Sequence, residues 1–213
     1  MIIEEISLAL QKGKANDVKA LVQQALAEGY TPKDILEKGL IQGMNVIGGK
    51  FKRNEVFVPE VLVAARAMNA GQEILRPVLV KSGIKPIGKA VICTVQGDLH
   101  DIGKNLVKMM LEGQAIACVD LGVDVPAEKV IAAIKEYEPD LLCLSALLTT
   151  TMIMQKEIIE AVNKAGLRNR VKIMVGGAPV TEKFALEIKA DGYAPDAASA
   201  AELAVQLIGE MHV

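Results

Sequence analysis

The stretch that decides the fold is residues 90–105, AVICTVQGDLHDIGKN. It joins a short apolar run, residues 90–95, to a loop that holds two glycines, two aspartates and a histidine within residues 96–103. An apolar run of this length, without polar alternation, is typical of a strand that is covered on both faces of a sheet. The segment therefore indicates a buried first strand that ends in a polar loop.

Three further apolar runs follow, AIACVDL (115–121), LLCLSAL (141–147) and KIMVGG (172–177), with a weaker strand near residues 191–194. The segments between them have the period and length of helices. Strands that alternate with helices are connected by right-handed crossovers and build a parallel sheet. The pattern predicts an α/β domain with a flavodoxin-like (Rossmann-type) parallel five-stranded sheet.

The first eighty residues have helical periodicity throughout. Asn16 is expected to cap the second helix and Gly29 to end it, while Thr31 and Pro32 have the order of an N-cap and a first helical residue. Pro59 begins the last helix. We therefore predict an all-α four-helix bundle over residues 1–81, a linker over residues 82–88 (SGIKPIG), and the α/β domain over residues 89–213.

Composition narrows the function classes. The net charge is -2 and aromatic residues make up 3% of the chain, so neither a basic field nor stacking platforms favour a nucleic acid partner. No apolar run reaches the roughly 18 residues that a membrane span needs, which favours a cytoplasmic protein. The three cysteines, Cys93, Cys118 and Cys143, form no CxxC pair and lie in apolar runs, so we expect them to be buried and free.

Ligands of such a sheet bind beyond the carboxyl ends of the strands, where the strand order reverses. This rule selects the loop of residues 96–103 and the segment of residues 145–151. His100 lies in the first loop, and Asp98 is placed to accept a hydrogen bond from one of its ring nitrogens and leave the other free for a metal. A lone imidazole suits a metal whose other positions a macrocycle fills, but a loop histidine can equally face solvent or cap a helix.

At these residues the sequence resembles a known family. Residues 97–105, GDLHDIGKN, resemble the Asp-x-His-x-x-Gly signature of corrinoid-binding domains, and Ser145-Ala-Leu and Gly176-Gly177 match the later parts of that signature in order. Gly43-Met44, Phe51 and Glu55-Val56-Phe57-Val58-Pro59 resemble the helical cap of cobalamin-dependent methionine synthase and of methanol and methylamine corrinoid proteins. The resemblance covers nearly the whole chain.

The resemblance implies a bound cobalamin or related cobamide, with His100 as the lower axial cobalt ligand, Asp98 as its orienting partner and Thr151 in the place of a serine that extends this pair. It puts Gly97, Leu99 and Asp101 under the corrin ring and makes Ile102 and Gly103 further cofactor-binding residues. It puts Ser145, Thr149, Gly176, Gly177 and Ala197 along the nucleotide tail and makes Leu147 a further cofactor-binding residue. As a lid over the reactive face it puts Phe51, Val58 and Val61.

Each softer assignment has an ordinary structural alternative. The lid residues have the spacing of bundle core, Gly176-Gly177 suits a tight turn after a strand, and the threonines suit helix N-caps, Thr150 first among them.

By resemblance the function is that of a methyl carrier, which takes a methyl group on Co(I) from a substrate-specific methyltransferase and passes it from methyl-Co(III) to a second methyltransferase with a thiol or tetrahydrofolate acceptor. A reductive activation protein is a further implied partner, and the chain itself is expected to be a non-catalytic subunit. The alternative is a cobamide-sensing or cobamide-storage protein. A phospho-acceptor domain is disfavoured because Ser145-Ala146-Leu147 stands where that class has an aspartate, and a nicotinamide domain because GxGxxG is absent.

Overall fold

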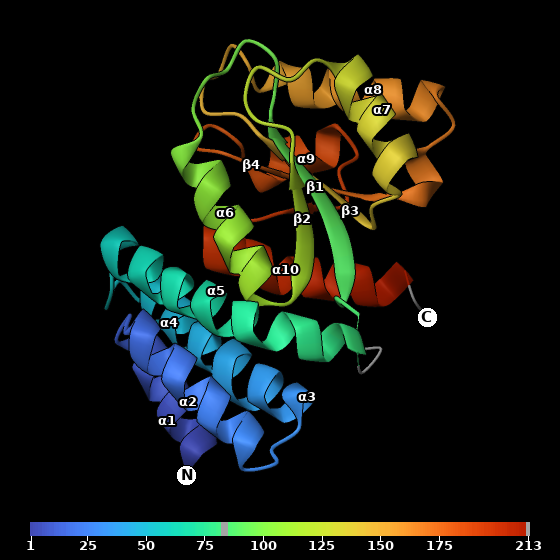
Figure 1. Ribbon diagram of the computed structural model, residues 1–213. Helices are drawn as coiled ribbons and strands as arrows, with labels where there is room; N and C mark the ends of the chain where they lie inside the picture. The colour runs from blue at the N-terminus through green and yellow to red at the C-terminus, as the bar shows by residue number, and fades with distance from the viewer. Residues whose placement is uncertain (82–84, 212–213) are drawn as a thin grey trace. The chain divides into compact units, whose positions relative to one another are not determined.

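The structure is a computed structural model that describes residues 1–81 and 85–211. Two compact units make up the chain, Met1–Pro86 and Ile87–Val213 (Figure 1). Residues 82–84 of the predicted linker and His212 lie outside the described residues. The first strand begins at Gly88, which the sequence analysis had assigned to the end of the linker.

The N-terminal unit is built of helices alone within its described part. Its elements are α1 (Ile2–Gln11), α2 (Ala15–Ala27), α3 (Pro32–Asp34), the π-helical η1 (Ile35–Ile41), α4 (Gln42–Lys52) and α5 (Val58–Lys81). Because α3, η1 and α4 run on without a break, the unit has the four helical stretches that the sequence predicts. The Thr31 side chain accepts the backbone N–H of Asp34 at 3.0 Å, as an N-cap should, and Gly29 with its positive φ follows the end of α2. The prediction for Asn16 is wrong, since α2 begins at Ala15 after Lys14.

Glycines inside the long third stretch serve packing against α1. A Cβ atom added at Gly39 would lie 3.2 Å from the Ile6 side chain, and one at Gly43 would lie 3.1 Å from the Ser7 carbonyl oxygen. Glycine costs a helix about 1 kcal/mol relative to alanine. Here it allows two helices to approach closely, which explains why a glycine-rich segment stays helical.

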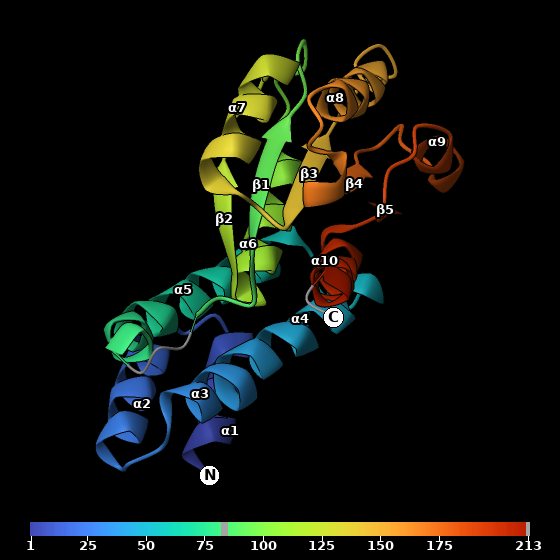
Figure 2. The same ribbon diagram turned by 90° about the vertical axis from the view of Figure 1, so that its right-hand side faces the viewer.

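The second unit is a parallel sheet in the order β2-β1-β3-β4-β5 (Figure 2). The strands are β1 (Gly88–Thr94), β2 (Ile116–Asp120), β3 (Leu141–Ser145), β4 (Lys172–Gly176) and the short β5 (Gly192–Tyr193). Thr94 pairs with Ser145, and Ser145 with Gly176, so β1, β3 and β4 end level with one another. The predicted flavodoxin-like order is confirmed, and the order reverses between β1 and β3.

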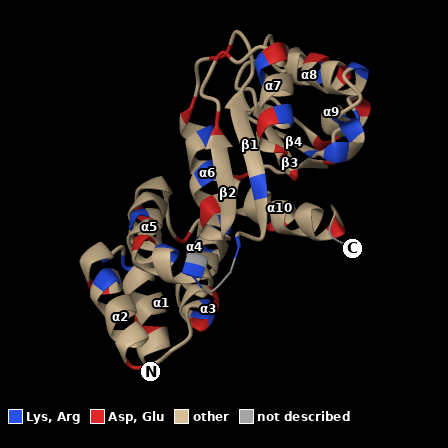
Figure 3. Ribbon diagram, turned by 45° about the vertical axis from the view of Figure 1, so that its right-hand side comes forward, with Lys and Arg blue, Asp and Glu red and all other residues tan. Residues whose placement is uncertain are grey.

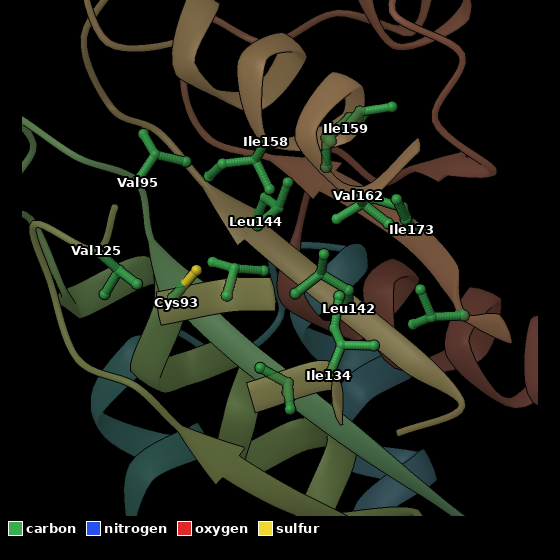
Figure 4. Packing of buried hydrophobic residues seen from close by; sticks show 14 of the residues in the cluster. Cys93, Val95, Val125, Ile134, Leu142, Leu144, Ile158, Ile159, Val162 and Ile173 are labelled. Carbon is green, nitrogen blue, oxygen red and sulfur yellow. The ribbon is translucent and has the colours of Figure 1, made fainter. Parts of the chain in front are cut away.

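Helices cover both faces of this sheet. They are α6 (Ile102–Gly113), α7 (Ala127–Tyr137), α8 (Ile153–Lys164), α9 (Glu182–Glu187) and α10 (Ala197–Met211), with a short 3-10 turn, η2, at Arg168–Arg170. α6 and α10 lie together on one face, and α7 and α8 on the other (Figure 1). Alternate strand residues such as Cys93 and Leu144 meet Ile134 and Ile158 in one apolar cluster (Figure 4). Two covered faces explain why the strands are apolar without alternation.

The remaining surface is mixed in charge. Acidic and basic side chains are interspersed over the outer helices (Figure 3), in pairs such as Lys156 with Glu160. Among the described residues, no helix combines the length and apolar content that a bilayer crossing needs.

All three cysteines are free, and burial raises the pKa of the Cys93 thiol to about 12. The expectation of buried cysteines holds for Cys93 and Cys143, whereas Cys118 is partly exposed.

Candidate functional site

The candidate site lies at the carboxyl ends of β1 and β3, where the strand order reverses. The loop after β1 carries Asp98 and His100, and the segment after β3 carries Leu147 and Thr151. Gly97 has a φ of +81°, the left-handed conformation that glycine adopts most readily, and this residue turns the chain at the strand end. The sheet thus brings together two loops that are about fifty residues apart in sequence.

Asp98 fixes the imidazole of His100. The carboxylate is fully buried, and its Oδ1 lies 2.7 Å from His100 Nδ1 and accepts the His100 backbone N–H at 3.1 Å. A carboxylate partner requires the proton on Nδ1, which leaves Nε2 with a free lone pair. The His100 side chain is 51% exposed, so that lone pair can reach a ligand outside the domain.

The other carboxylate oxygen ties this pair to the segment after β3. Oδ2 accepts the backbone N–H of Leu147 at 2.7 Å and lies 2.7 Å from Thr151 Oγ1. The Thr151 oxygen also lies 3.1 Å from the Leu148 carbonyl, but its single proton favours the nearer, charged acceptor. Burial favours the neutral acid, yet the hydrogen bonds from Thr151, from Leu147 and from the histidine outweigh burial and hold the pKa of Asp98 well below its ordinary value. A carboxylate that stays ionised keeps the imidazole oriented.

Two residues that the sequence analysis missed hold the same loop from the other side. The buried Thr94 hydroxyl donates to the His100 carbonyl oxygen at 2.8 Å. The Asp124 side chain accepts the Gly97 N–H at 2.7 Å, while its own N–H donates to the Asp98 carbonyl at 3.0 Å. The sequence held a signal for each of them. Thr94 is a polar residue at the end of an apolar strand and Asp124 is an acid in the turn after β2, so both lie at the carboxyl edge of the sheet, where ligands bind.

Apolar side chains around His100 fit a large, flat ligand. Leu99 and Ile102, on either side of it, are 72% and 77% exposed, and Leu147 and Leu148 across from them are also exposed. A group of exposed leucines and isoleucines at one sheet edge is typical of a binding surface. No group of three or more His, Cys, Asp or Glu in the described part of the chain could hold a bare metal ion. A single exposed imidazole beside these apolar side chains suits a metal already held by a macrocycle, whose coordination the imidazole completes.

The predicted tail residues lie at the same edge but differ in surroundings. Thr149 is exposed, whereas Ala197 is buried as the first residue of α10. In the loop after β1, Gly103 is exposed and Asp101 accepts the Asn105 side-chain amide. None of the three threonines caps α8, which begins after Met152, so the N-cap alternative is wrong. Ser145 and Gly176 are half-buried, at the ends of β3 and β4.

Gly177 meets the backbone of the neighbouring loop directly. Its φ is +123°, and an added Cβ would lie 1.8 Å from the Ala146 carbonyl oxygen. Only glycine permits this approach, so the tight-turn alternative accounts for Gly177. Its contact with the nucleotide tail stays a prediction.

The predicted lid residues lie in the N-terminal unit. Val61 is fully buried, as expected of bundle core, and Phe51 and Val58 are half-buried. The exposed apolar side chains of this segment are instead Phe57, Val63 and Leu62, which are 62%, 47% and 41% exposed. The sequence could not separate Val61 from Phe57 and Leu62, because all three lie within one apolar stretch around the start of α5.

A flavodoxin-like sheet whose switch point carries an oriented imidazole with one free nitrogen defines a cofactor-binding domain for a macrocycle-held metal. Known proteins agree with this class. B12 binding domain families match residues 88–202 and, in the helical unit, residues 2–76. A corrinoid protein of Desulfitobacterium hafniense is 40% identical over 212 residues, 98% of each chain, and dimethylamine corrinoid protein 3 of Methanosarcina acetivorans is 42% identical over 207 residues, 97% of each.

Solved structures agree as well. The methanol:cobalamin methyltransferase complex MtaBC from Methanosarcina barkeri contains a chain that matches with a TM-score of 0.85 and 34% identity, over 98% of this chain and 80% of that one. The chain belongs to the family of B12-binding corrinoid proteins, and its cofactor is cobalamin or a related cobamide.

Proposed function

We propose that this protein is a methyl carrier, in which His100 coordinates cobalt from below and the bound corrinoid carries a methyl group between two methyltransferases. The relatives named dimethylamine corrinoid proteins and the similarity to a chain of a methanol methyltransferase complex support a methyl donor of the methylamine or methanol type. The proposed acceptor enzyme uses a thiol or tetrahydrofolate, and a reductive activation protein restores Co(I).

The single observation that carries the proposal is the Asp98–His100 pair, 2.7 Å apart, with Nε2 directed away from its buried partner. The cobalt supplies the methyl-binding chemistry, and the protein supplies the axial ligand and holds it in a fixed orientation. Asp98 holds the histidine in one tautomer, and Thr151 and Leu147 hold Asp98. When the other ring nitrogen donates its hydrogen to a carboxylate, the imidazole becomes a stronger ligand.

We further propose that the helical unit protects the upper face of the corrinoid. Exposed Phe57 and Leu62 supply the apolar surface for such a lid, in place of the buried Val61.

The test is methyl uptake. The full chain, loaded with cobalamin and reduced to Co(I), is mixed with a methylamine or methanol methyltransferase and its methyl donor. We expect the Co(I) absorption band to disappear only when enzyme and donor are both present. A protein that binds cobalamin tightly but takes no methyl group from any enzyme of this series would instead support cobamide storage or sensing.

A further inference from the structure

His100 is held inside the sheet unit by its main chain as well as by its ring. Asp98 Oδ1 lies 2.7 Å from Nδ1 and accepts the backbone N–H at 3.1 Å, and the Thr94 hydroxyl donates to the carbonyl oxygen at 2.8 Å. Nε2 is then the group that is left for a ligand. The imidazole and its neighbour Leu99 are largely exposed, so packing contributes little to the placement of the ring. Hydrogen bonds therefore decide where Nε2 is presented.

The contact with the carbonyl oxygen is one that Asp98 and the following helix do not supply. α6 begins at Ile102, and its first backbone hydrogen bond runs from the Asn105 N–H to the Asp101 carbonyl at 2.7 Å. The His100 carbonyl lies one residue before that bond, and the Thr94 hydroxyl satisfies it. Without this donor the carbonyl would turn toward water, and the peptide that carries the imidazole would turn with it.

Thr94 is a rigid point from which to hold this peptide. It is the last residue of β1 and fully buried, and its neighbours Cys93 and Val95 belong to the apolar cluster on the opposite face of the sheet (Figure 4). Its N–H donates to the Gly122 carbonyl at 3.0 Å, and its own carbonyl accepts the Val125 N–H at 3.1 Å. A branched side chain suits a strand, but valine would fill the same space. The strand alone therefore gives no reason for a hydroxyl at this position.

The oxidation state of cobalt gives such a reason. Cobalt(II) in a corrin binds an axial nitrogen, whereas cobalt(I), with an electron pair on that axis, does not. Uptake of one electron by cobalt(II) therefore releases the imidazole, and a tighter axial bond lowers the reduction potential. The apparent affinity of the imidazole is its intrinsic affinity multiplied by the fraction of molecules in the competent conformation. A fixed peptide raises that fraction.

We propose that Thr94 is a positioning residue, which holds the main chain of His100 and thereby sets the potential of the Co(II)/Co(I) couple. The inference rests on the proposed coordination by His100. Asp98 fixes the ring and its tautomer, and Thr94 fixes the peptide on which the ring is carried.

The test is a redox titration of the full chain loaded with cobalamin. In Thr94→Val the affinity of His100 for cobalt(II) should fall about tenfold, the factor for one hydrogen bond of about 1.4 kcal/mol. A tenfold weaker bond to the oxidised state raises the one-electron potential by about 59 mV. Thr94→Ser keeps the hydroxyl and should keep the wild-type potential. An unchanged potential in Thr94→Val overturns the proposal.

Two controls separate positioning from other effects. In a His100→Ala background, Thr94→Val should leave the potential unmoved, because Thr94 acts through the histidine. Val91→Ala removes buried apolar atoms from the same strand, so it should lower the midpoint of thermal unfolding without changing the potential. A shift equal to that of Thr94→Val in either control contradicts the assignment.

A second readout needs no variant. The peptide between His100 and Asp101 is the one that Thr94 holds, so the Asp101 amide of the corrinoid-free wild type should have the nuclear magnetic resonance order parameter of rigid backbone, about 0.85. A value below about 0.6 contradicts the inference even if Thr94→Val fails to fold. Failure of His100 coordination is separate, since it shows as a missing nitrogen splitting on Co(II) in the wild type.

Discussion

Asp98→Asn tests the hydrogen-bond network of the site through stability. One carboxylate oxygen accepts from His100 and the other from Leu147 and Thr151, but an asparagine has only one oxygen. Whichever side the oxygen takes, the NH2 group faces donors. If the NH2 group faces the segment after β3, the Thr151 hydroxyl can turn to the Leu148 carbonyl oxygen, 3.1 Å away, but the Leu147 N–H loses its acceptor.

A hydrogen bond to a charged group contributes about 1.5–3 kcal/mol, and the contact between two donors adds to its loss. We expect Asp98→Asn to lower the free energy of unfolding of the corrinoid-free protein by about 3 kcal/mol at pH 7. Urea unfolding followed by circular dichroism measures this change. Asp124→Asn is the matched control at the same edge; Asp124 is exposed, and an asparagine oxygen can still accept the Gly97 N–H, so its loss should stay below about 1 kcal/mol.

The loss should also depend on pH. The pKa of Asp98 is lowered in the folded protein, so its stabilisation is present above the unfolded pKa of about 3.9 and is lost as the pH falls toward the folded value. The difference between wild type and Asp98→Asn should therefore shrink by about 1 kcal/mol between pH 7 and pH 3. A difference that is equal at both pH values, or smaller than that of Asp124→Asn, would refute this reasoning.

Three further changes separate packing, lid and ion pair. Gly177→Ala should unfold the sheet unit or lower its free energy of unfolding by more than about 3 kcal/mol, because the new Cβ would lie 1.8 Å from the Ala146 carbonyl oxygen. In Gly176→Ala the nearest atom is 3.6 Å from the new Cβ, so thermal unfolding of this control should be unchanged. Phe57 is exposed, so Phe57→Ser should leave the bundle folded and the cobamide bound. The Co(I) absorption band should disappear faster in air than in the wild type, and an unchanged rate would argue against a lid. Lys104→Met removes a buried ammonium that lies 2.7 Å from Asp120 Oδ2, and should cost about 3–5 kcal/mol in urea unfolding; a loss below 1 kcal/mol would mean that the pair is not needed.

The architecture could be read from the sequence because it depends on periodicity. Continuous apolar runs such as residues 90–95 identify strands covered on both faces, and the rule for switch points then leads to His100 and Asp98. The end of the second helix and the Thr31 cap were predicted from local chemistry. Asn16 was not a cap, because α2 begins at Ala15, two residues before the helix start that a cap at Asn16 would give.

The contacts that complete the site could not be predicted in the same way. Leu147 contributes its backbone N–H to Asp98, which no side-chain pattern reveals. Asp124 contacts the loop after β1 only because the ends of β1 and β2 are neighbours. Val61 and Phe57 could not be told apart before their burial was known.

The most direct test of the account is the electron paramagnetic resonance spectrum of the Co(II) form of the full chain loaded with cobalamin. A nitrogen ligand splits the cobalt signal, and protein uniformly labelled with 15N identifies that nitrogen as the protein's own. We predict the protein's nitrogen splitting in the wild type and in His212→Ala, which removes the other histidine of the chain, and its absence in His100→Ala with cobalamin still bound. A His100→Ala protein that keeps the wild-type splitting would contradict the assignment of His100 as the cobalt ligand.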